Sequence, residues 1–273
     1  GNLEAVPAEE LFGHDEDGNQ LVDISGSTVG GYNKTQVMRT SFRTPRSVLM
    51  ASHAFGMGMY REGPVVQAIT NQQGWDYLGY DIVSGDFTQS GNQVTLTRSL
   101  NKSPHPLVEY QNPNQLLKQN WYADRESEVQ GIIEKIEHLI KEEDVLPHEI
   151  MVTFLWPYEL RDGPLKMLIS DLENRFDRDH VVNDVTQIVR ERGDRGNIRV
   201  EGEVSLTNIY HSRGNQAPIV FVLGLDMVAE QTSKKLTKKK VRQWRQKHVE
   251  LRNKAFVAFT RTQGWLYVSG KNV

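Results

Sequence analysis

Cysteine is missing from the 273-residue sequence, and its absence excludes disulfide bonds and thiolate metal sites. The eight histidines are scattered and lack the HExxH or other paired spacing of a metal site, so we expect this chain to bind no metal by itself. Apolar runs long enough to cross a bilayer are missing, as is a charged-then-apolar signal pattern at the N-terminus. We therefore expect a cytoplasmic protein without a membrane partner.

The two motifs that usually hold a nucleoside triphosphate are missing as well. No GxxxxGKS/T loop occurs, because Gly264 and the pair Gly270-Lys271 have the wrong spacing and no following Ser or Thr. There is also no acidic D-E-x-Q motif that would hold Mg²⁺. A chain that lacks both motifs is not expected to bind ATP tightly or to hydrolyse it alone.

The charges that are present are unevenly distributed. Hydrophobic residues make up 38% of the chain and charged residues 25%, which is typical of a folded globular protein. Residues 234–254 hold ten Lys or Arg against one acid, and the rest of the chain, with 22 basic and 34 acidic residues, carries a net charge of −12. Such a segment is most often the solvated face of a helix. Alternatively it contacts a nucleic-acid backbone, with Trp244 as either a base-stacking platform or a packing residue.

The order of helix and strand signals predicts an α/β fold with a mainly parallel sheet and helices on both faces. The first 35 residues, rich in Gly, Asp, Glu and Asn, are predicted to be an extended lead-in. One domain is expected over 36–273, with a small β-rich insert at about 64–124 that contains strands near 77–83 and 93–97. Helices are predicted at 45–59, 126–143, 164–176 and 234–258, and strands at 150–155, 204–209, 219–225 and 265–268.

Three motifs with polar residues follow one another along the chain. The first places an arginine at the start of a helix, the second is a glycine-bearing polar loop between two strands, and the third ends a helix in Thr-Arg just before the last strand. They are residues 40–46 (TSFRTPR), 207–222 (TNIYHSRGNQAPIVFV) and 252–261 (RNKAFVAFTR).

In order and spacing these motifs resemble helicase motifs IV, V and VI of the UvrD/Rep group of superfamily 1 DNA helicases. In that group the motifs read roughly N-Y-R-S-T, T-x-H-x-x-K-G-x-E-x-P-x-V and Y-V-x-x-T-R-A. The predicted helix at 126–143 and the strand at 150–155 match the organisation of the group too. The resemblance covers residues 36–62 and 125–270, and it implies the second RecA-like domain of such a motor, a P-loop NTPase-like fold.

The resemblance implies catalytic roles for Arg43 and Arg261, the arginines of motifs IV and VI, which reach into the ATP cleft of the first RecA-like domain. An arginine suits this role because it is planar and always charged, and negative charge spreads over the γ-phosphate as its bond breaks. A lone arginine is usually only a surface residue, so the expectation depends on the order of the motifs. Gly214 permits close approach of the nucleotide. Gln216 stands where the family has a ribose-binding glutamate, and its amide can still accept that hydrogen bond.

The resemblance also implies a single-strand DNA track. The family's Thr, His and Lys fall on Asn208, Tyr210 and Arg213, departures that keep the polarity but put the DNA-contacting and coupling roles in doubt. The residues expected to bind nucleic acid are Thr207, Asn208, Tyr210, His211, Arg213, Lys238, Lys239, Lys240 and Trp244.

As a whole the resemblance implies the C-terminal motor half of an ATP-dependent DNA helicase. The intact protein would use ATP and Mg²⁺, with single-stranded DNA and its own N-terminal RecA-like domain as partners. Because such motors carry both Walker motifs upstream of motif IV, we expect the sequence to be part of a longer protein. About 50 residues separate the strand at 150–155 from motif V, too few for the large second accessory domain of UvrD and Rep.

The alternative is a non-catalytic RecA-like module that binds nucleic acid or regulates a partner. A nucleotide-binding enzyme of another class, such as a kinase, is disfavoured because no phosphate-binding loop is present.

Overall fold

The computed structural model describes most of the chain beyond residue 38 and two short strands before it. The described ranges are 28–29, 32–33, 39–59, 69–89, 91–109, 112–156, 163–177, 180–186, 197–212, 214–229 and 238–272. In these ranges, the side chains of 28–29, 32–33, 109, 113 and 238–248 lie outside the description.

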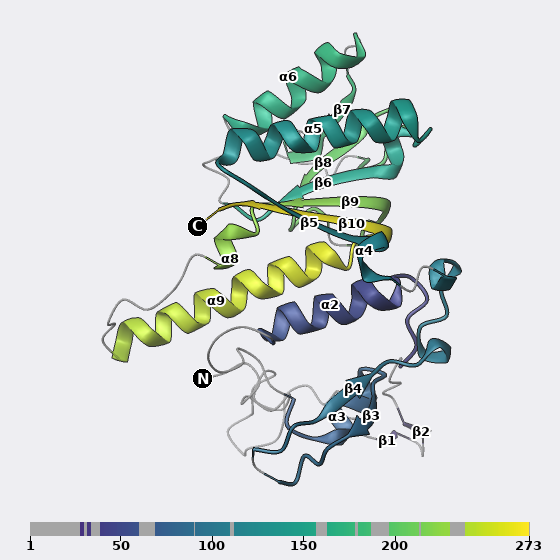
Figure 1. The fold of residues 1–273 in the computed structure, drawn as a ribbon, viewed down its shortest axis with the longest axis vertical. Helices are drawn as coiled ribbons and strands as arrows, with labels where there is room; N and C mark the ends of the chain where they lie inside the picture. Colours follow the sequence, from purple (N-terminus) through teal and green to yellow (C-terminus); the bar gives the residue numbers. More distant parts are fainter. Residues whose placement is uncertain are drawn as a thin grey trace.

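Six strands form the main sheet (Figure 1). In spatial order they are β5 (Leu117–Tyr122), β10 (Thr262–Lys271), β9 (Ala217–Leu223), β6 (Ile150–Phe154), β8 (Val204–Asn208) and β7 (Val182–Asp184). Every neighbouring pair is parallel, so all six strands begin at one edge of the sheet, the amino edge, and end at the opposite carboxyl edge. The predicted α/β fold with a mainly parallel sheet is confirmed.

Helices cover both faces of this sheet (Figure 1). α5 (Arg125–Glu142) and α6 (Pro164–Phe176) lie on one face, and α2 (Arg46–Met57) and α9 (Lys238–Phe259) on the other. Successive strand residues point to opposite faces, so β9 places Phe221 in the core under α5 and Val220 in the core above α9. The predicted apolar stripe of α5 is confirmed, with Val129, Ile132, Ile133, Ile136 and Leu139 all buried.

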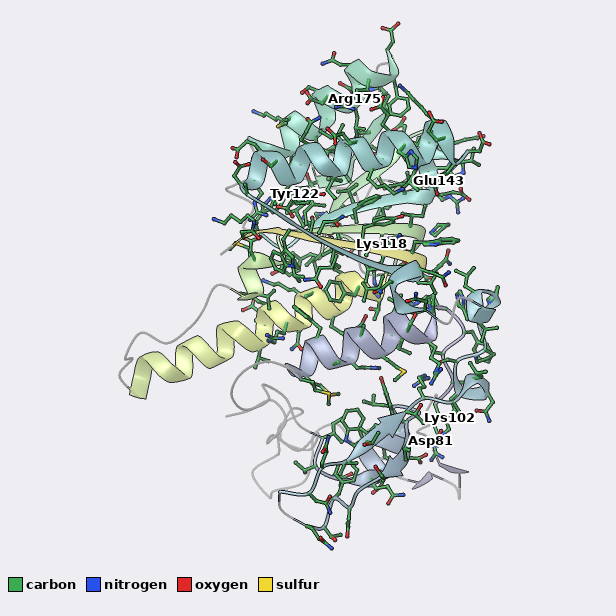
Figure 2. All side chains as sticks on the ribbon, viewed as in Figure 1. Asp81, Lys102, Lys118, Tyr122, Glu143 and Arg175 are labelled. Carbon is green, nitrogen blue, oxygen red and sulfur yellow. The ribbon has the colours of Figure 1, made fainter. Side chains whose placement is uncertain are left out.

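The insert forms a small module of its own beside α2 (Figure 1). Its buried residues Trp75 and Tyr80 pack with Met57 from the end of α2, and Lys102 Nζ lies 2.6 Å from Asp81 Oδ1 (Figure 2). Its elements are α3 (Gln72–Tyr77), β3 (Asp81–Ser84), β4 (Thr95–Thr97), η1 (Leu100–Lys102), η2 (Pro106–Glu109) and α4 (Pro113–Leu116). The remaining short elements are β1 (Thr28–Val29), β2 (Tyr32–Asn33), η3 (Pro147–Glu149) and α8 (Asp226–Ala229).

Two strand predictions differ from the structure in this region. The strand expected near 77–83 starts only at Asp81, because the side chain of Asn71 accepts a 2.7 Å hydrogen bond from Gly74 N and caps a helix over the preceding residues. Gly79, at φ +82, then turns the chain where a Cβ would lie 2.2 Å from Arg39 O. The second difference is β5, which the sequence placed in the insert and which instead forms an edge strand of the main sheet, paired with β10.

None of the helices in the described ranges combines the length and the apolarity needed to cross a bilayer. In the same ranges, no three His, Asp or Glu side chains are grouped as a metal site would require.

Candidate functional site

The residues of motifs V and VI meet at the amino edge of the main sheet, where β9 and β10 begin. Arg261 lies between the end of α9 and the start of β10, and Gln216 directly precedes β9. Ala217 N donates a 3.2 Å hydrogen bond to Arg261 O, and Gln263 Nε2 donates a 3.0 Å hydrogen bond to Gln216 Oε1. Two segments 45 positions apart in the sequence therefore become direct neighbours.

Arg43 reaches the same edge from the loop before α2. Its side chain is exposed, and its carbonyl oxygen lies 3.0 Å from His105 Nε2. Two residues further on, Leu107 packs against Gly264 at the start of β10, where an added Cβ would come within 3.3 Å of Leu107 Cδ1. The insert thus connects the Arg43 loop with the strand that follows Arg261.

The loop that carries Arg43 is fixed to the insert by two other arginines. Arg98 is almost completely buried and donates hydrogen bonds of 2.8 Å from Nη2 to the carbonyl oxygens of Arg39 and Lys102. Arg46, in the first turn of α2, donates back to Arg98 O and, at 3.1 Å, to Thr97 Oγ1. Sequence reasoning did not single out either residue as a positioning group, because the bonds that join the loop to the insert, Arg98–Arg39, Arg46–Arg98 and Arg46–Thr97, span more than 50 positions.

The side chain of Arg261 is half-buried and lies against the end of α9. Its Nε donates a 2.9 Å hydrogen bond to Val257 O, and Nη2 lies 3.4 Å from Thr260 Oγ1. A cation here also compensates the negative end of the helix dipole. The guanidinium is therefore tied to α9, so a shift of the end of α9 would move Arg261 with it.

The loop after β8 is held in a compact turn by its own polar groups. Asn208 Oδ1 accepts a 3.0 Å hydrogen bond from His211 N, and Asn208 O accepts one of 2.9 Å from Ser212 N. Thr207 is fully buried in β8, so its side chain cannot touch a ligand in this arrangement. Gly214 adopts φ +86 with open space where a Cβ would be, which leaves room for a ligand beside the loop.

Tyr210 projects from this turn towards α9 and is 59% exposed. Lys254 Nζ lies 5.3 Å from the centre of its ring, and the same ammonium lies 2.6 Å from Glu250 Oε1. Desolvation alone would lower the pKa of Lys254, but hydrogen bonds to Glu250 and Tyr210, together with their charges, outweigh it and raise that pKa. His211 is half-buried, with Nδ1 lacking a hydrogen-bond partner among the described residues.

The other predicted nucleic-acid residues are only partly described. Arg213 lies outside the described residues. Helix α9 contains four more of these residues, of which the structure describes the backbone but not the side chains: Lys238, Lys239, Lys240 and Trp244. Sixteen residues separate Lys238 from Lys254, which at 1.5 Å per residue is about 24 Å along the helix. Figure 1 shows this end of α9 projecting past the sheet, so the basic segment lies far along the helix from Lys254, the residue of α9 that contacts Tyr210.

A buried charge cluster at the carboxyl edge was missed by sequence reasoning. Glu128 has no exposed surface and accepts hydrogen bonds from Gly224 N at 2.9 Å and Ser269 Oγ at 2.6 Å, as well as from Arg125. Arg125 also donates to the buried Asp226 at 2.7 Å. The cluster ties the start of α5 to the ends of β9 and β10. A charged residue beside the apolar stripe of α5 is the signal that could have revealed it, because a carboxylate facing a core must be paired.

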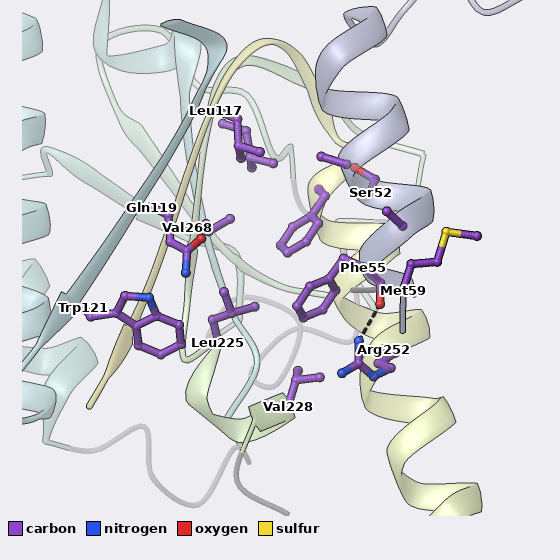
Figure 3. Close-up of a pocket in the computed structure, with 14 residues that line it drawn as sticks. Ser52, Phe55, Met59, Leu117, Gln119, Trp121, Leu225, Val228, Arg252 and Val268 are labelled. Carbon is purple, nitrogen blue, oxygen red and sulfur yellow. Dashed lines mark hydrogen bonds between the residues drawn. The ribbon is translucent and has the colours of Figure 1, made fainter. Parts of the chain in front are cut away.

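A pocket of about 450 Å³ lies under β5 between α2 and α9 (Figure 3). Its wall consists mainly of apolar side chains, including Phe55, Trp121 and Leu225, and Arg252 is the only charged residue among the described residues that line it. Arg252 donates a 2.6 Å hydrogen bond to Phe55 O and lies over the Phe55 ring. This lining can hold an apolar group but offers no pair of acidic and basic side chains for catalysis.

Comparisons with known proteins add little to the geometry described above. No known family model matches the sequence, and no curated protein matches it. Among the solved structures that match is the C-terminal domain of a possible DNA helicase from Lactobacillus plantarum WCFS1. It is 12% identical, and the match covers 57% of this chain and 73% of that chain with a TM-score of 0.36. A similarity this low carries no weight for function.

Proposed function

We propose that this chain is the second RecA-like half of an ATP-dependent superfamily 1 DNA helicase of the UvrD/Rep type. The observation that carries the proposal is that the segments of Gln216 and Arg261 are neighbours at the amino edge of the sheet. The hydrogen bonds Gln263–Gln216 and Ala217–Arg261 join these segments, and the Arg43 loop is connected to the same edge. Motifs V and VI resemble helicase motifs, and 45 residues separate Gln216 from Arg261. Neighbouring positions for these two segments are expected if Gln216 and Arg261 serve one nucleotide.

The chemistry of this edge suits half of an ATP site. Arg43 and Arg261 would offer guanidinium groups to the charge that develops on the γ-phosphate, and Gln216 would accept a hydrogen bond from the ribose. The described residues at this edge include no acidic cluster that could hold Mg²⁺. In the proposal, the phosphate loop and the magnesium ligands come from an N-terminal RecA-like domain of the intact protein, which is cytoplasmic and also binds single-stranded DNA.

The test is the ATPase activity of the intact protein with Arg43→Ala or Arg261→Ala. An arginine that stabilises the transition state in phosphoryl transfer contributes on the order of 10³–10⁵ in rate, so we expect a loss of that size with an unchanged fold. Arg175→Ala is the matched control, since this arginine pairs with Glu137 on the opposite face of the sheet (Figure 2). Rate losses below about tenfold for both variants would show that neither arginine serves the ATP cleft.

A non-catalytic module that binds nucleic acid or regulates a partner is the second candidate. One observation favours it: motif V carries Asn208 and Tyr210 where the family has Thr and His. For such a module, Arg43→Ala and Arg261→Ala would leave the ATPase rate of any partner unchanged, whereas binding to the nucleic acid or the partner would depend on the loop after β8.

A further inference from the structure

Tyr210 is presented to solvent by a turn that leaves its ring little freedom to fold back. Ile209 before it is 4% exposed and packs in the core above α9, and Ser212 after it is fully buried. Asn208 closes the turn with hydrogen bonds from His211 N and Ser212 N. Because the residues on both sides are anchored, the large exposed ring costs little conformational entropy when it binds a ligand.

One face of the ring already has a partner. Lys254 Nζ lies 5.3 Å from the ring centre, and its salt bridge with Glu250, one turn earlier on α9, holds the ammonium in place. A cation over one face of an aromatic ring interacts with the ring's negative quadrupole. This contact favours an orientation of the ring in which Lys254 of α9 lies on one side of it.

Among the side chains that the structure describes, the Glu250–Lys254 pair sets the charge beside the ring. Glu250 is 59% exposed and shares its charge with Lys254, so the pair offers little net attraction to a phosphate. A flat, exposed aromatic face suits a nucleobase instead, since every base has a face that can stack. Bases within a duplex already stack on their neighbours, so the favoured ligand is a single strand.

We propose that Tyr210 is a stacking platform for one base of single-stranded DNA, with Lys254 supporting the ring from behind. The inference rests on the proposed function, and it adds that the loop after β8 binds a base, whereas the distant basic segment of α9 would bind phosphates. The platform tolerates any base, because stacking involves no base-edge hydrogen bonds.

The test compares Tyr210→Ala and Tyr210→Phe in the intact protein, using oligo(dT) and an oligonucleotide of equal length whose central sites are abasic. Stacking of one base is worth about 1–3 kcal/mol, so Tyr210→Ala should weaken oligo(dT) binding about 5- to 150-fold. Tyr210→Phe, which keeps the ring, should stay within about twofold of the wild type. On the abasic oligonucleotide all three proteins should bind equally, and the salt dependence should not change between them.

Two results would overturn the stacking role. One is unchanged oligo(dT) binding by Tyr210→Ala, and the other is an equal loss on both oligonucleotides, which would indicate a phosphate contact or a disturbed fold. If the wild type fails to bind oligo(dT) at all, the proposed function and the stacking role fall together. If Arg43→Ala and Arg261→Ala leave ATP hydrolysis intact while Tyr210→Ala still weakens only the base-containing strand, the helicase proposal fails and the stacking role stands.

Discussion

Glu128 joins three segments of the fold through hydrogen bonds to its carboxylate. Its carboxylate has no exposed surface and joins Arg125 on its own helix, Gly224 after β9 and Ser269 of β10. Removing one partner of a buried ion pair costs about 3–5 kcal/mol. We expect Glu128→Ala to lower the free energy of unfolding by about 3 kcal/mol, at the lower end of this range, because Arg125 keeps its contact with Asp226.

Urea unfolding measures this loss, and Glu126→Ala is the matched control on the same turn of α5. Glu126 is exposed and interacts mainly with the helix dipole, which is worth less than about 1 kcal/mol. Equal and small losses for the two variants would show that the buried cluster does not stabilise the fold.

Among the elements, α9 connects the most distant parts of the candidate site. It begins with Lys238 in the basic segment, contacts Tyr210 through Lys254, and ends next to Arg261. Arg252 of α9 also donates a hydrogen bond to the carbonyl oxygen of Phe55 in α2. One continuous helix therefore joins the basic segment to Val257, whose carbonyl oxygen accepts a hydrogen bond from the guanidinium of Arg261.

Replacing Lys238, Lys239 and Lys240 with Gln tests the basic end of this helix. If the three lysines contact phosphates, single-strand affinity should fall for all sequences alike, because phosphate contacts carry no base information. Each lost contact lowers the log–log salt slope by about 0.7, so the slope should fall by about 2 in total. Lys135→Gln on α5, across the sheet, is the control. An unchanged slope in the triple variant would assign the segment to a solvated helix face.

For the molecule as a whole, the amino edge provides arginines and an amide, whereas no phosphate-binding loop occurs in the sequence. We expect the isolated chain to bind ATP too weakly to detect at micromolar concentrations, because most of the contacts to the phosphates and Mg²⁺ are missing. Isothermal titration with a non-hydrolysable ATP analogue measures this directly. Micromolar binding by the isolated chain would contradict the half-site proposal.

The sequence alone determined the α/β class, the position of α5 and four of the six strands of the main sheet. These features depend on local periodicity, such as the Val129–Leu139 stripe, and on runs of buried apolar residues such as residues 150–154. It did not determine that β5 belongs to the main sheet, because Lys118, Gln119 and Asn120 are exposed on this edge strand and give no apolar signal.

The tertiary structure alone decided which polar residues meet. The order of the motifs in the sequence predicted Arg43, Gln216 and Arg261 as site residues. The hydrogen bonds Gln216–Gln263 and Ala217–Arg261 form only because β9 and β10 pair in parallel. The same holds for the Glu128 cluster, whose partners lie 96 and 141 positions away in the chain. Local sequence carries the propensity for helices and strands, whereas contacts between distant polar groups depend on the register of the sheet that brings them together.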